Sequence, residues 1–333
     1  MKVSVFEAEE WERAAFQRLS AEHEVRFEAA PLDQELARKH ADAEVISTFI
    51  YSAMDEKVLD ACTGLRLIAT RSTGFDHIDM DSCLRRGVRV ANVPTYGKNT
   101  VAEHVFALLL GLSHRLVDAV ERTRRGDFSQ SGLTGFDLLG RTMGVIGTGD
   151  IGRHTIRLAK GFGMEVLAVD TAPDEDLAPT LGFRYTGMAE LLAGSDVVSL
   201  HVPACPGTHH LLGPEEFRAM KPGTILINTS RGSVVDTTAL LRALSDGTVA
   251  AAGLDVLEEE PTVREEAELV RSVFARDHNL ETLLGDHILL RMRNVLITPH
   301  TAFNTRDAVH RILSTTCDNI LAHAAGRPRN LVH

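Results

Sequence analysis

The sequence predicts an α/β protein made of two doubly wound parallel-sheet domains with a cleft between them. Its length of 333 residues is about twice the ~150 residues of a typical domain. Short segments rich in β-branched residues alternate with segments of helical periodicity along almost the whole chain. Parallel strands joined by crossover helices produce that alternation.

The N-terminal part contains four strand-like segments, at residues 3–6, 24–27, 44–50 and 66–71. Segments such as 9–19 and 55–61 lie between them and have helical character. A helix over about residues 100–125 follows, because apolar residues recur there at three- and four-residue spacing. The length of this helix suits a connector between two domains.

The alternation of strands and helices restarts after a glycine-rich segment at residues 129–140. Six strand-like segments follow, namely TMGVIG, EVLAVD, VVSLHV, TILINT, AAGLDV and NVLITP. Six strands complete a doubly wound sheet. Beyond Pro299 only one long helical pattern remains, at about residues 304–325, which is too little for a domain. We therefore expect the C-terminus to return to the first domain.

The composition excludes several classes of protein. With 44% hydrophobic and 24% charged residues, the chain matches ordinary globular proteins rather than disordered or fibrous ones. The formal charge of −11 disfavours nucleic acid and anionic membranes as partners. A small anionic substrate stays possible, because an arginine or a helix N-terminus can reverse the potential inside one cleft.

The cysteines and the N-terminus predict a cytoplasmic protein. The four cysteines form no C-x-x-C pair, and acidic residues stand near the N-terminus where a secretory signal is apolar. The most apolar run, residues 101–112, is shorter than the ~20 residues that cross a bilayer, so no membrane is expected as a partner. No metal is expected either, since the histidines lack ligand spacing and the adjacent His209 and His210 should point in different directions.

A glycine-rich turn predicts a dinucleotide site. In TMGVIGTGDIGRH, Gly147, Gly149 and Gly152 stand between a strand and a helix, and Asp170 ends the next strand. Gly147 permits the tight turn, Gly149 lets the backbone approach the pyrophosphate, and Gly152 allows close helix–strand packing. The helix N-terminus at Ile151 faces the phosphates.

Asp170 predicts NAD rather than NADP as the cofactor. Its carboxylate can accept hydrogen bonds from the adenosine ribose hydroxyls, and its charge repels a 2′-phosphate. Binding a 2′-phosphate normally requires a nearby arginine. The residues that follow, Thr171, Ala172 and Pro173, include none.

Three strand ends of the second domain carry residues suited to oxo-acid chemistry. Arg231 follows TILINT, Asp255 and then Glu260 follow AAGL, and His300 follows VLITP. Reactive groups gather at the carboxyl ends of strands in such sheets. Arg231 can bind a carboxylate through two hydrogen bonds and polarise the adjacent carbonyl. His300 can exchange a proton with the substrate oxygen, and a Glu260 carboxylate beside it would stabilise the imidazolium. Reduction of a 2-oxo acid to a 2-hydroxy acid needs these functions.

At these residues the sequence resembles the D-2-hydroxyacid dehydrogenase family, through GTGDIG, NTSRG, GLDVLEEEP and TPH in that order. The resemblance implies that Arg231, Glu260 and His300 are catalytic and that a hydride passes between nicotinamide C4 and substrate C2. It also implies two Rossmann-like or flavodoxin-like domains. Residues 1–99 and 300–333 would bind the substrate, and residues 100–299 would bind NAD.

The resemblance extends to further residues and to a subgroup. The tyrosine in VPTY, the long interval from Glu260 to His300 and the segment TPHTAFNT look most like the D-lactate dehydrogenases, with pyruvate as the favoured substrate. Backbone amides of Thr73 and Gly74 would hold the substrate carboxylate, with Tyr96 beside it. Beyond the glycines, Ile151 and Asp170, the residues expected to line the cofactor are Asp150, Val202, Pro203, Thr208, Thr229, Ser230 and Asp255. A homodimer is expected, with residues 100–140 at its interface.

Some positions depart from the family pattern. Asp150 stands where His or Arg is common and places a carboxylate near the pyrophosphate. His77 replaces the usual Asn of D-N-I-D, and Asn304 stands where an aromatic residue is frequent in lactate enzymes. The alternatives are therefore a reductase of glyoxylate, hydroxypyruvate or another 2-oxo acid, a phosphite-oxidising enzyme, and a non-enzymatic NAD(H)-sensing protein like the corepressors of this fold. Turnover of NADH with a panel of 2-oxo acids distinguishes an enzyme from a sensor.

Overall fold

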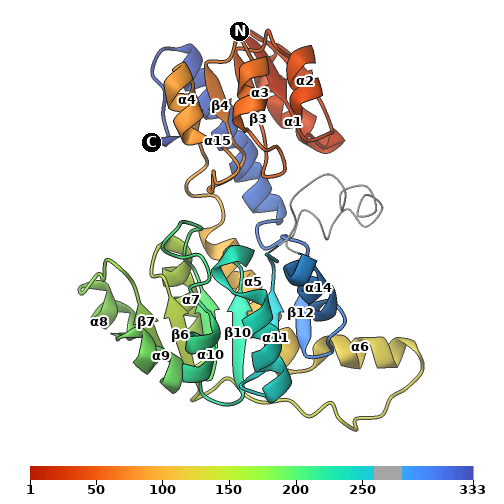
Figure 1. The fold of residues 1–333 in the computed structure, drawn as a ribbon, viewed down its shortest axis with the longest axis vertical. Coiled ribbons are helices and arrows are strands. Elements are labelled where there is room, and N and C mark those ends of the chain that lie inside the picture. The colour runs from red at the N-terminus through yellow and green to blue at the C-terminus, as the bar shows by residue number, and fades with distance from the viewer. Residues whose placement is uncertain (259–279, 333) are drawn as a thin grey trace. The chain divides into compact units, whose positions relative to one another are not determined.

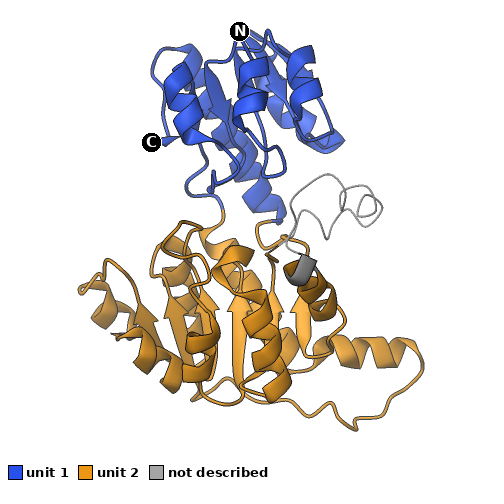
Figure 2. Cartoon of the chain, viewed as in Figure 1, with its two compact units in different colours: residues 1–96, 304–333 blue, residues 97–303 orange. Residues whose placement is uncertain are grey.

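The computed structural model describes residues 1–258 and 280–332 and divides the chain into two compact units (Figure 2). Unit 1 comprises Met1–Tyr96 and Asn304–His333, and unit 2 comprises Gly97–Phe303. The sequence places these boundaries after residues 99 and 299 instead. The difference assigns His300 to the same unit as Arg231.

Unit 1 is built on a six-stranded sheet with the strand order β13-β5-β4-β3-β1-β2. Its strands are β1 (Lys2–Val5), β2 (Glu24–Phe27), β3 (Val45–Ser47), β4 (Leu67–Ala69), β5 (Arg89–Ala91) and β13 (Leu331–Val332). All neighbours are parallel except β13, which runs antiparallel to β5. The sequence predicts the first four strands. It misses β5 and β13.

Helices cover the sheet of unit 1. They are η1 (Glu10–Glu12), α1 (Arg13–Phe16), η2 (Gln17–Leu19), α2 (Gln34–Lys39), α3 (Glu56–Ala61), α4 (Met80–Arg86) and α15 (Arg306–Ala324). The helix expected at residues 9–19 is therefore broken into three short turns. Asp33, Asp55 and Asp79 cap α2, α3 and α4 by accepting a hydrogen bond from a backbone N–H of the first turn. The C-terminal helix α15 packs against α1 and β4, which returns the chain to the first domain.

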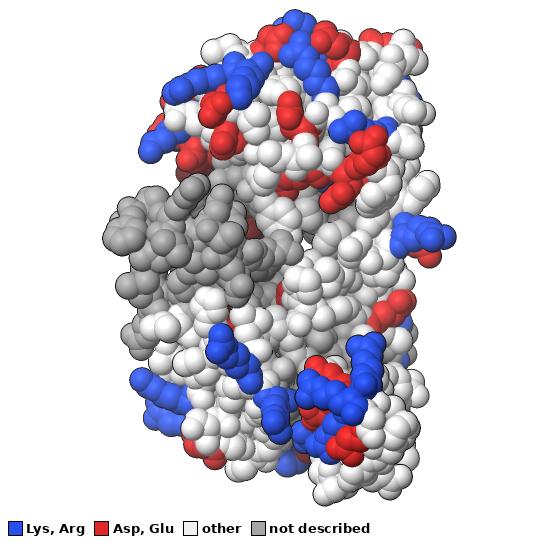
Figure 3. Space-filling model, turned by 90° about the vertical axis from the view of Figure 1, so that its right-hand side faces the viewer, with Lys and Arg blue, Asp and Glu red and all other residues white. Residues whose placement is uncertain are grey.

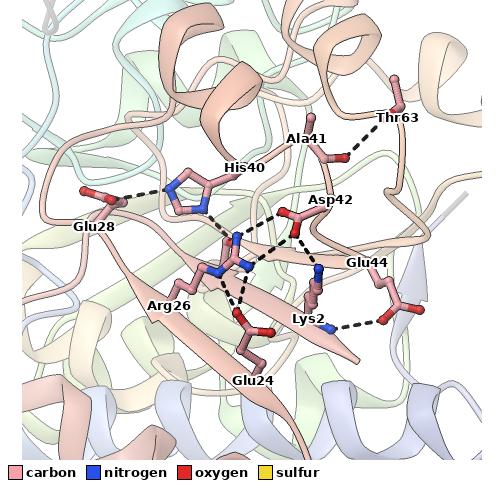
Figure 4. A network of polar contacts seen from close by, with 10 residues as sticks. Lys2, Glu24, Arg26, Glu28, His40, Ala41, Asp42, Glu44 and Thr63 are labelled. Carbon is pink, nitrogen blue, oxygen red and sulfur yellow. Dashed lines mark hydrogen bonds and ion pairs between the residues drawn. The ribbon is translucent and has the colours of Figure 1, made fainter.

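A polar network in unit 1 joins β1, β2 and the segment before β3 (Figure 4). Asp42 pairs with Lys2 at 2.6 Å and with Arg26 at 2.9 Å. Beneath these exposed pairs, the buried ring of His40 lies 2.9 Å from the hydroxyl of Ser4. Exposed ion pairs contribute little individually, so the buried contact is the more important for stability. On the face shown in Figure 3, basic side chains lie among acidic ones.

Unit 2 contains a seven-stranded parallel sheet with the order β12-β11-β10-β9-β6-β7-β8. Its strands are β6 (Thr142–Ile146), β7 (Glu165–Val169), β8 (Arg184–Tyr185), β9 (Val197–Leu200), β10 (Thr224–Asn228), β11 (Val249–Leu254) and β12 (Val295–Ile297). All six expected strands are present, and β8 is additional. The strand order reverses between β6 and β9, which is the switch point where ligands bind in such sheets.

The helices of unit 2 lie on both faces of its sheet (Figure 1). They are α5 (Lys98–Ser113), α6 (Leu116–Arg124), α7 (Asp150–Gly161), α8 (Leu177–Leu181), α9 (Met188–Gly194), α10 (Pro214–Ala219), η3 (Gly232–Val234), α11 (Thr237–Asp246) and α14 (Leu280–Leu289). Successive strand residues enter opposite hydrophobic cores, as Val145 and Ile146 do. Both faces of the sheet are thus buried, which explains the continuous apolar runs of the strands.

The prediction of one helix over residues 100–125 is wrong, because α5 and α6 are separate helices that meet at a bend of 63°. Arg115 between them has a φ of 49°, a left-handed conformation that interrupts a helix. Much of α5 is buried, whereas no residue of α6 is, and α6 extends away from the sheet (Figure 1). Within the described ranges no single helix is long and apolar enough to cross a membrane. The bent pair passes that test only by length and composition.

Candidate active site at the carboxyl edge of the unit 2 sheet

Parallel strands bring the site residues of unit 2 to one edge of its sheet. The register pairs Ile146 with Val169 and with Leu200, so the residues that follow these strands emerge side by side. From β12 to β7, the residues expected in the site that follow the strands are His300, Asp255, Arg231, Val202, Gly147 and Asp170. The glycine turn therefore lies on one side of the switch point, and the arginine and histidine lie on the other.

The turn from β6 to α7 has the backbone geometry of a phosphate-binding loop. Gly147 has a φ of 95°, and a Cβ there would lie 2.5 Å from the carbonyl oxygen of His201. A Cβ on Gly152 would lie 2.0 Å from the carbonyl oxygen of Gly147. A Cβ on Gly149 would meet nothing within 4 Å, so this point of the turn is open. Because Gly149 is also the N-cap of α7, no side chain of the cap competes with an anion for the first N–H groups.

Asp170 is held in place at the end of β7. Thr148 donates to Oδ2 from its backbone nitrogen, at 2.6 Å, and from its hydroxyl, at 2.9 Å. The backbone nitrogen of Ala172 donates to Oδ1 at 2.9 Å. Burial raises the pKa of Asp170, but these hydrogen bonds outweigh burial and leave the pKa below its ordinary value. The strand therefore ends in an ionised, oriented carboxylate.

Further contacts around Asp170 and Thr148 come from Tyr185, Asp174 and Arg153, which the sequence does not single out. The hydroxyl of Tyr185, on β8, lies 2.8 Å from Thr148 Oγ1 and accepts a hydrogen bond from the backbone nitrogen of Asp174. Arg153, on α7, donates to the carbonyl oxygen of Thr148 at 2.9 Å and pairs with the Asp174 carboxylate at 3.2 Å. The residues directly after Asp170 include no arginine, and Arg153 comes from the helix that follows the glycine turn.

The loop after β9 contains Val202, Pro203 and Thr208. The Thr208 hydroxyl donates to the carbonyl oxygen of Pro203 at 2.6 Å and accepts from the backbone nitrogen of Cys205 at 3.0 Å, which closes the loop. The same hydroxyl is the main cause that lowers the pKa of the Cys205 thiol. Burial lowers the pKa of His201, at the start of this loop, to about 4.

The turn after β10 presents Thr229, Ser230 and Arg231. Asn228 orders it by accepting from the nitrogen and the hydroxyl of Ser230, at 3.0 and 2.8 Å, and by donating to the carbonyl oxygen of Arg231 at 2.9 Å. The hydroxyl of Thr229 is buried, and it has no hydrogen-bond partner within the part of the chain that the structure describes. A bound ligand would satisfy such an atom. The open Gly149 and this hydroxyl both fit a dinucleotide along the edge.

Asp255 orders the turn that carries His300. Its buried carboxylate accepts from the Thr298 hydroxyl at 2.5 Å and from the backbone nitrogens of residues 301–302 at 2.9 Å each. Burial raises the pKa of Asp255, but hydrogen bonds from His104, Thr298 and these nitrogens give a net lowering. The backbone nitrogen of His300 donates to the carbonyl oxygen of Asp255 at 2.9 Å, and His300 has a left-handed φ of 53°. Asp255 thus fixes the position of His300.

Glu260 lies outside the residues that the structure describes. Glu258, two residues earlier, lies 2.6 Å from His210 Nε2 and accepts from the Thr237 hydroxyl at 2.9 Å. The expectation that His209 and His210 point in different directions is wrong, because their rings stack with centroids 4.0 Å apart. The left-handed φ of 49° at His210 explains the stacking. These two histidines and Glu258 place potential metal ligands within 4.8 Å of one another.

The residues expected to contact the substrate from the other domain lie in unit 1. Thr73 and Gly74 follow β4 at the carboxyl edge of that sheet. The Thr73 hydroxyl donates to the carbonyl oxygen of Val93 at 2.8 Å. The carbonyl oxygen of Tyr96, the last residue before unit 2, accepts from Arg311 at 2.8 Å. Unit 1 thus fixes the backbone of both segments by its own contacts.

The glycine turn and strand-end aspartate of this doubly wound sheet are typical of a dinucleotide-dependent oxidoreductase, and an arginine and a histidine stand at other strand ends. Residues 106–302 match the family model described as D-isomer specific 2-hydroxyacid dehydrogenase, NAD binding domain. The chain belongs to the D-isomer specific 2-hydroxyacid dehydrogenase family, and it is an NAD-dependent enzyme of that family.

Relatives and solved structures match the chain over nearly its whole length. It is 35% identical to a D-lactate dehydrogenase of Escherichia coli, over 96% of each chain. It is 34% identical to a glyoxylate reductase of Korarchaeum cryptofilum, over 100% of this chain and 96% of the relative. A D-lactate dehydrogenase of Aquifex aeolicus, solved with NAD and lactic acid, is 36% identical over 98% of this chain and 96% of its own, with a TM-score of 0.86.

Proposed function

We propose that the protein is a D-lactate dehydrogenase that reduces pyruvate with NADH. The observation that carries this proposal is the likeness, over 98% of the chain, to the Aquifex aeolicus protein solved with both NAD and lactic acid. The order of groups along the unit 2 edge supports it. Arg231 and His300 follow β10 and β12, and the glycine turn follows β6 on the far side of the switch point.

Each residue has a distinct part in the proposed reaction. Bound NADH supplies a hydride to the carbonyl carbon of the substrate. The guanidinium of Arg231 binds the substrate carboxylate and draws electron density from the adjacent carbonyl. His300 donates a proton to the carbonyl oxygen as the hydroxyl forms, and Glu260 stabilises the protonated ring. From unit 1, the amides of Thr73 and Gly74 hold the carboxylate, and Tyr96 lies beside the substrate.

The second candidate is a reductase of glyoxylate, hydroxypyruvate or another 2-oxo acid. The full-length similarity to the Korarchaeum cryptofilum glyoxylate reductase favours it. The proposed roles of Arg231 and His300 apply unchanged to these acids, because each acid carries a carbonyl next to a carboxylate. The substrate side chain, and not the reacting groups, separates the two candidates.

A panel of 2-oxo acids tests both candidates. Oxidation of NADH is followed with pyruvate, glyoxylate, hydroxypyruvate and a branched 2-oxo acid, and the product is resolved on a chiral phase. The expected result is the highest kcat/KM with pyruvate and formation of the D-hydroxy acid. A higher kcat/KM with glyoxylate selects the second candidate. Absence of turnover with every acid contradicts both and leaves an NAD(H)-binding protein without this activity.

We also propose a cytoplasmic homodimer. All four cysteines are free thiols, which fits a reducing compartment. Large apolar side chains are exposed on α6 and the segment after it, namely Leu116, Val117, Val120, Phe128 and Leu139. An exposed apolar surface of this kind favours association of two copies. Sedimentation at working concentration measures the mass, and a monomer would contradict the proposal.

A further inference from the structure

Lys98 and Asp150 form an ion pair beside the glycine turn. Lys98 is the first residue of α5 and Asp150 is the first residue of α7, and these two helices pack against each other. Lys98 Nζ lies 2.8 Å from Asp150 Oδ2, and the two side chains are 34% and 54% exposed. The sequence singles out Asp150 as an unusual carboxylate near the pyrophosphate. It does not predict the lysine that comes from another helix.

A carboxylate at this point opposes the binding of a phosphate. The N-terminus of α7 attracts anions through its first N–H groups, and Asp150 places a negative charge at the same end. A pyrophosphate is itself negatively charged, so the two anions repel each other at short range. A cation beside Asp150 is needed to restore the attraction.

The neighbouring cations of α7 are less suited to this role than Lys98. Arg153 donates to the carbonyl oxygen of Thr148 and pairs with Asp174. The pKa of His154 is lowered by burial and by the positive charges of Arg157 and Lys98, so the neutral ring predominates at pH 7. Lys98 already contacts the first residue of the helix and has a flexible stem with three donors.

We infer that Lys98 is a cofactor-binding residue of this enzyme. Its ammonium offsets the negative charge of Asp150, and its remaining N–H donors can bind the pyrophosphate at the start of α7. The basic group at this end of α7 comes from α5 and not from the glycine turn itself. The inference concerns the affinity for NAD(H), so it holds whichever 2-oxo acid the enzyme reduces.

Binding measurements on the full chain without substrate test the inference. In calorimetric titrations, Lys98→Gln should raise the Kd of NADH and of ADP-ribose by about tenfold. Asp150→Asn should lower both Kd values by about threefold, because it removes the repulsion and leaves the lysine to the phosphate. Lys98→Arg keeps the charge and should bind NADH within about twofold of the wild type.

Two controls separate a phosphate contact from a general effect on α7. Lys160 is 31% exposed and pairs with Glu165 at the other end of the same helix, so Lys160→Gln removes an equivalent exposed ion pair and should leave the Kd unchanged. Adenosine, which lacks phosphate, should have the same Kd for the wild type and for Lys98→Gln. Unchanged affinity of Lys98→Gln for ADP-ribose would overturn the inference, as would an equal loss for adenosine. If Lys98→Gln does not fold, an Asp150→Asn variant that binds NADH no more tightly would overturn it too.

Discussion

The two ends of the carboxyl edge of the unit 2 sheet, here called the nucleotide corner and the reaction corner, are built in different ways. The nucleotide corner, at β6 to β8, is a closed set of contacts in which Thr148 joins Asp170 and Tyr185. The reaction corner, at β10 to β12, depends on one buried carboxylate, Asp255, and contains a buried Thr229 hydroxyl without a partner among the described residues. We expect cofactor binding to depend on unit 2, because residues 106–302 match the NAD binding domain of the family. The reaction proposed at β10 to β12 would also use Thr73, Gly74 and Tyr96 of unit 1.

The largest expected effect comes from a substitution of Gly152 in the nucleotide corner. A Cβ there would lie 2.0 Å from the backbone oxygen of Gly147, and neither backbone can move without opening the turn. Gly152→Ala should lower the free energy of unfolding by about 3 kcal/mol and weaken NADH binding by about 100-fold or more. Denaturant unfolding and calorimetric titration measure the two quantities.

The matched control is Gly161→Ala, in the last turn of the same helix, where a Cβ meets nothing within 4 Å. It should preserve both stability and affinity. If Gly152→Ala bound NADH like the control, the tight turn would not be the phosphate site.

A substitution of His300 should lower turnover without weakening NADH binding, so it tests the reaction corner separately from the nucleotide corner. Its left-handed φ favours His300→Asn as the variant, since asparagine adopts this conformation readily. Loss of general acid catalysis should reduce turnover by about 100-fold or more. The Kd of NADH should stay within about twofold of the wild type, because the nucleotide corner is intact. Stopped-flow turnover and equilibrium binding on the same preparation test this, and a parallel loss of affinity would contradict the separation.

The glycine turn and the strand-end aspartate can be located from the sequence because their signal is contiguous. Strand, glycine turn, helix and strand-end aspartate follow one another within residues 142–170, so local spacing is enough. The residues that it misses reach the corner from other elements. Tyr185 lies on a two-residue strand that shows no periodicity, and Lys98 starts a helix far earlier in the chain. Spacing along a chain carries no information about such pairs.

Backbone conformation accounts for two other differences between the sequence-based predictions and the structure. The apolar spacing continues across Arg115, so the pattern alone predicts one helix where the left-handed φ makes two. The same conformation at His210 turns neighbouring rings into a stacked pair. Asp255 was expected only to line the cofactor, and its role in holding the His300 turn emerges from contacts with residues 298–302. The assignment of Glu260 remains a prediction from the sequence.

The loop after β9, which lies between the two corners, should lower the free energy of unfolding at acid pH. His201 starts the loop after β9, and burial lowers its pKa from an ordinary 6.5 to about 4. Below pH 6.5 the unfolded chain binds a proton there that the folded chain does not, so this contribution to stability is complete above pH 6.5 and falls toward pH 4. Because His201 as a whole residue is half-buried, we expect a loss on the order of 2 kcal/mol.

His201→Gln measures this contribution. Glutamine can keep a hydrogen bond to the Ser199 hydroxyl, which lies 2.9 Å from His201 Nε2, and does not titrate. Unfolding by denaturant at several pH values between 7 and 4.5 should show a shallower decline for the variant. Equal declines would mean that other groups cause the acid sensitivity and that the middle of the edge does not limit it.

The smallest expected effect concerns the choice of cofactor at the nucleotide corner. Asp174 holds the Arg153 guanidinium at 3.2 Å, and Arg153 also contacts Thr148, which binds the Asp170 that we expect to exclude a 2′-phosphate. Asp174→Ala should release the guanidinium toward a 2′-phosphate and raise kcat/KM for NADPH by about fivefold, with little change for NADH. The ratio of the two kcat/KM values is the measurement. Asp176→Ala removes the same charge from an exposed position two residues later and should leave the ratio unchanged. If both variants raised NADPH use equally, net charge and not the position of Arg153 would set the preference, and the corner would discriminate cofactors through Asp170 alone.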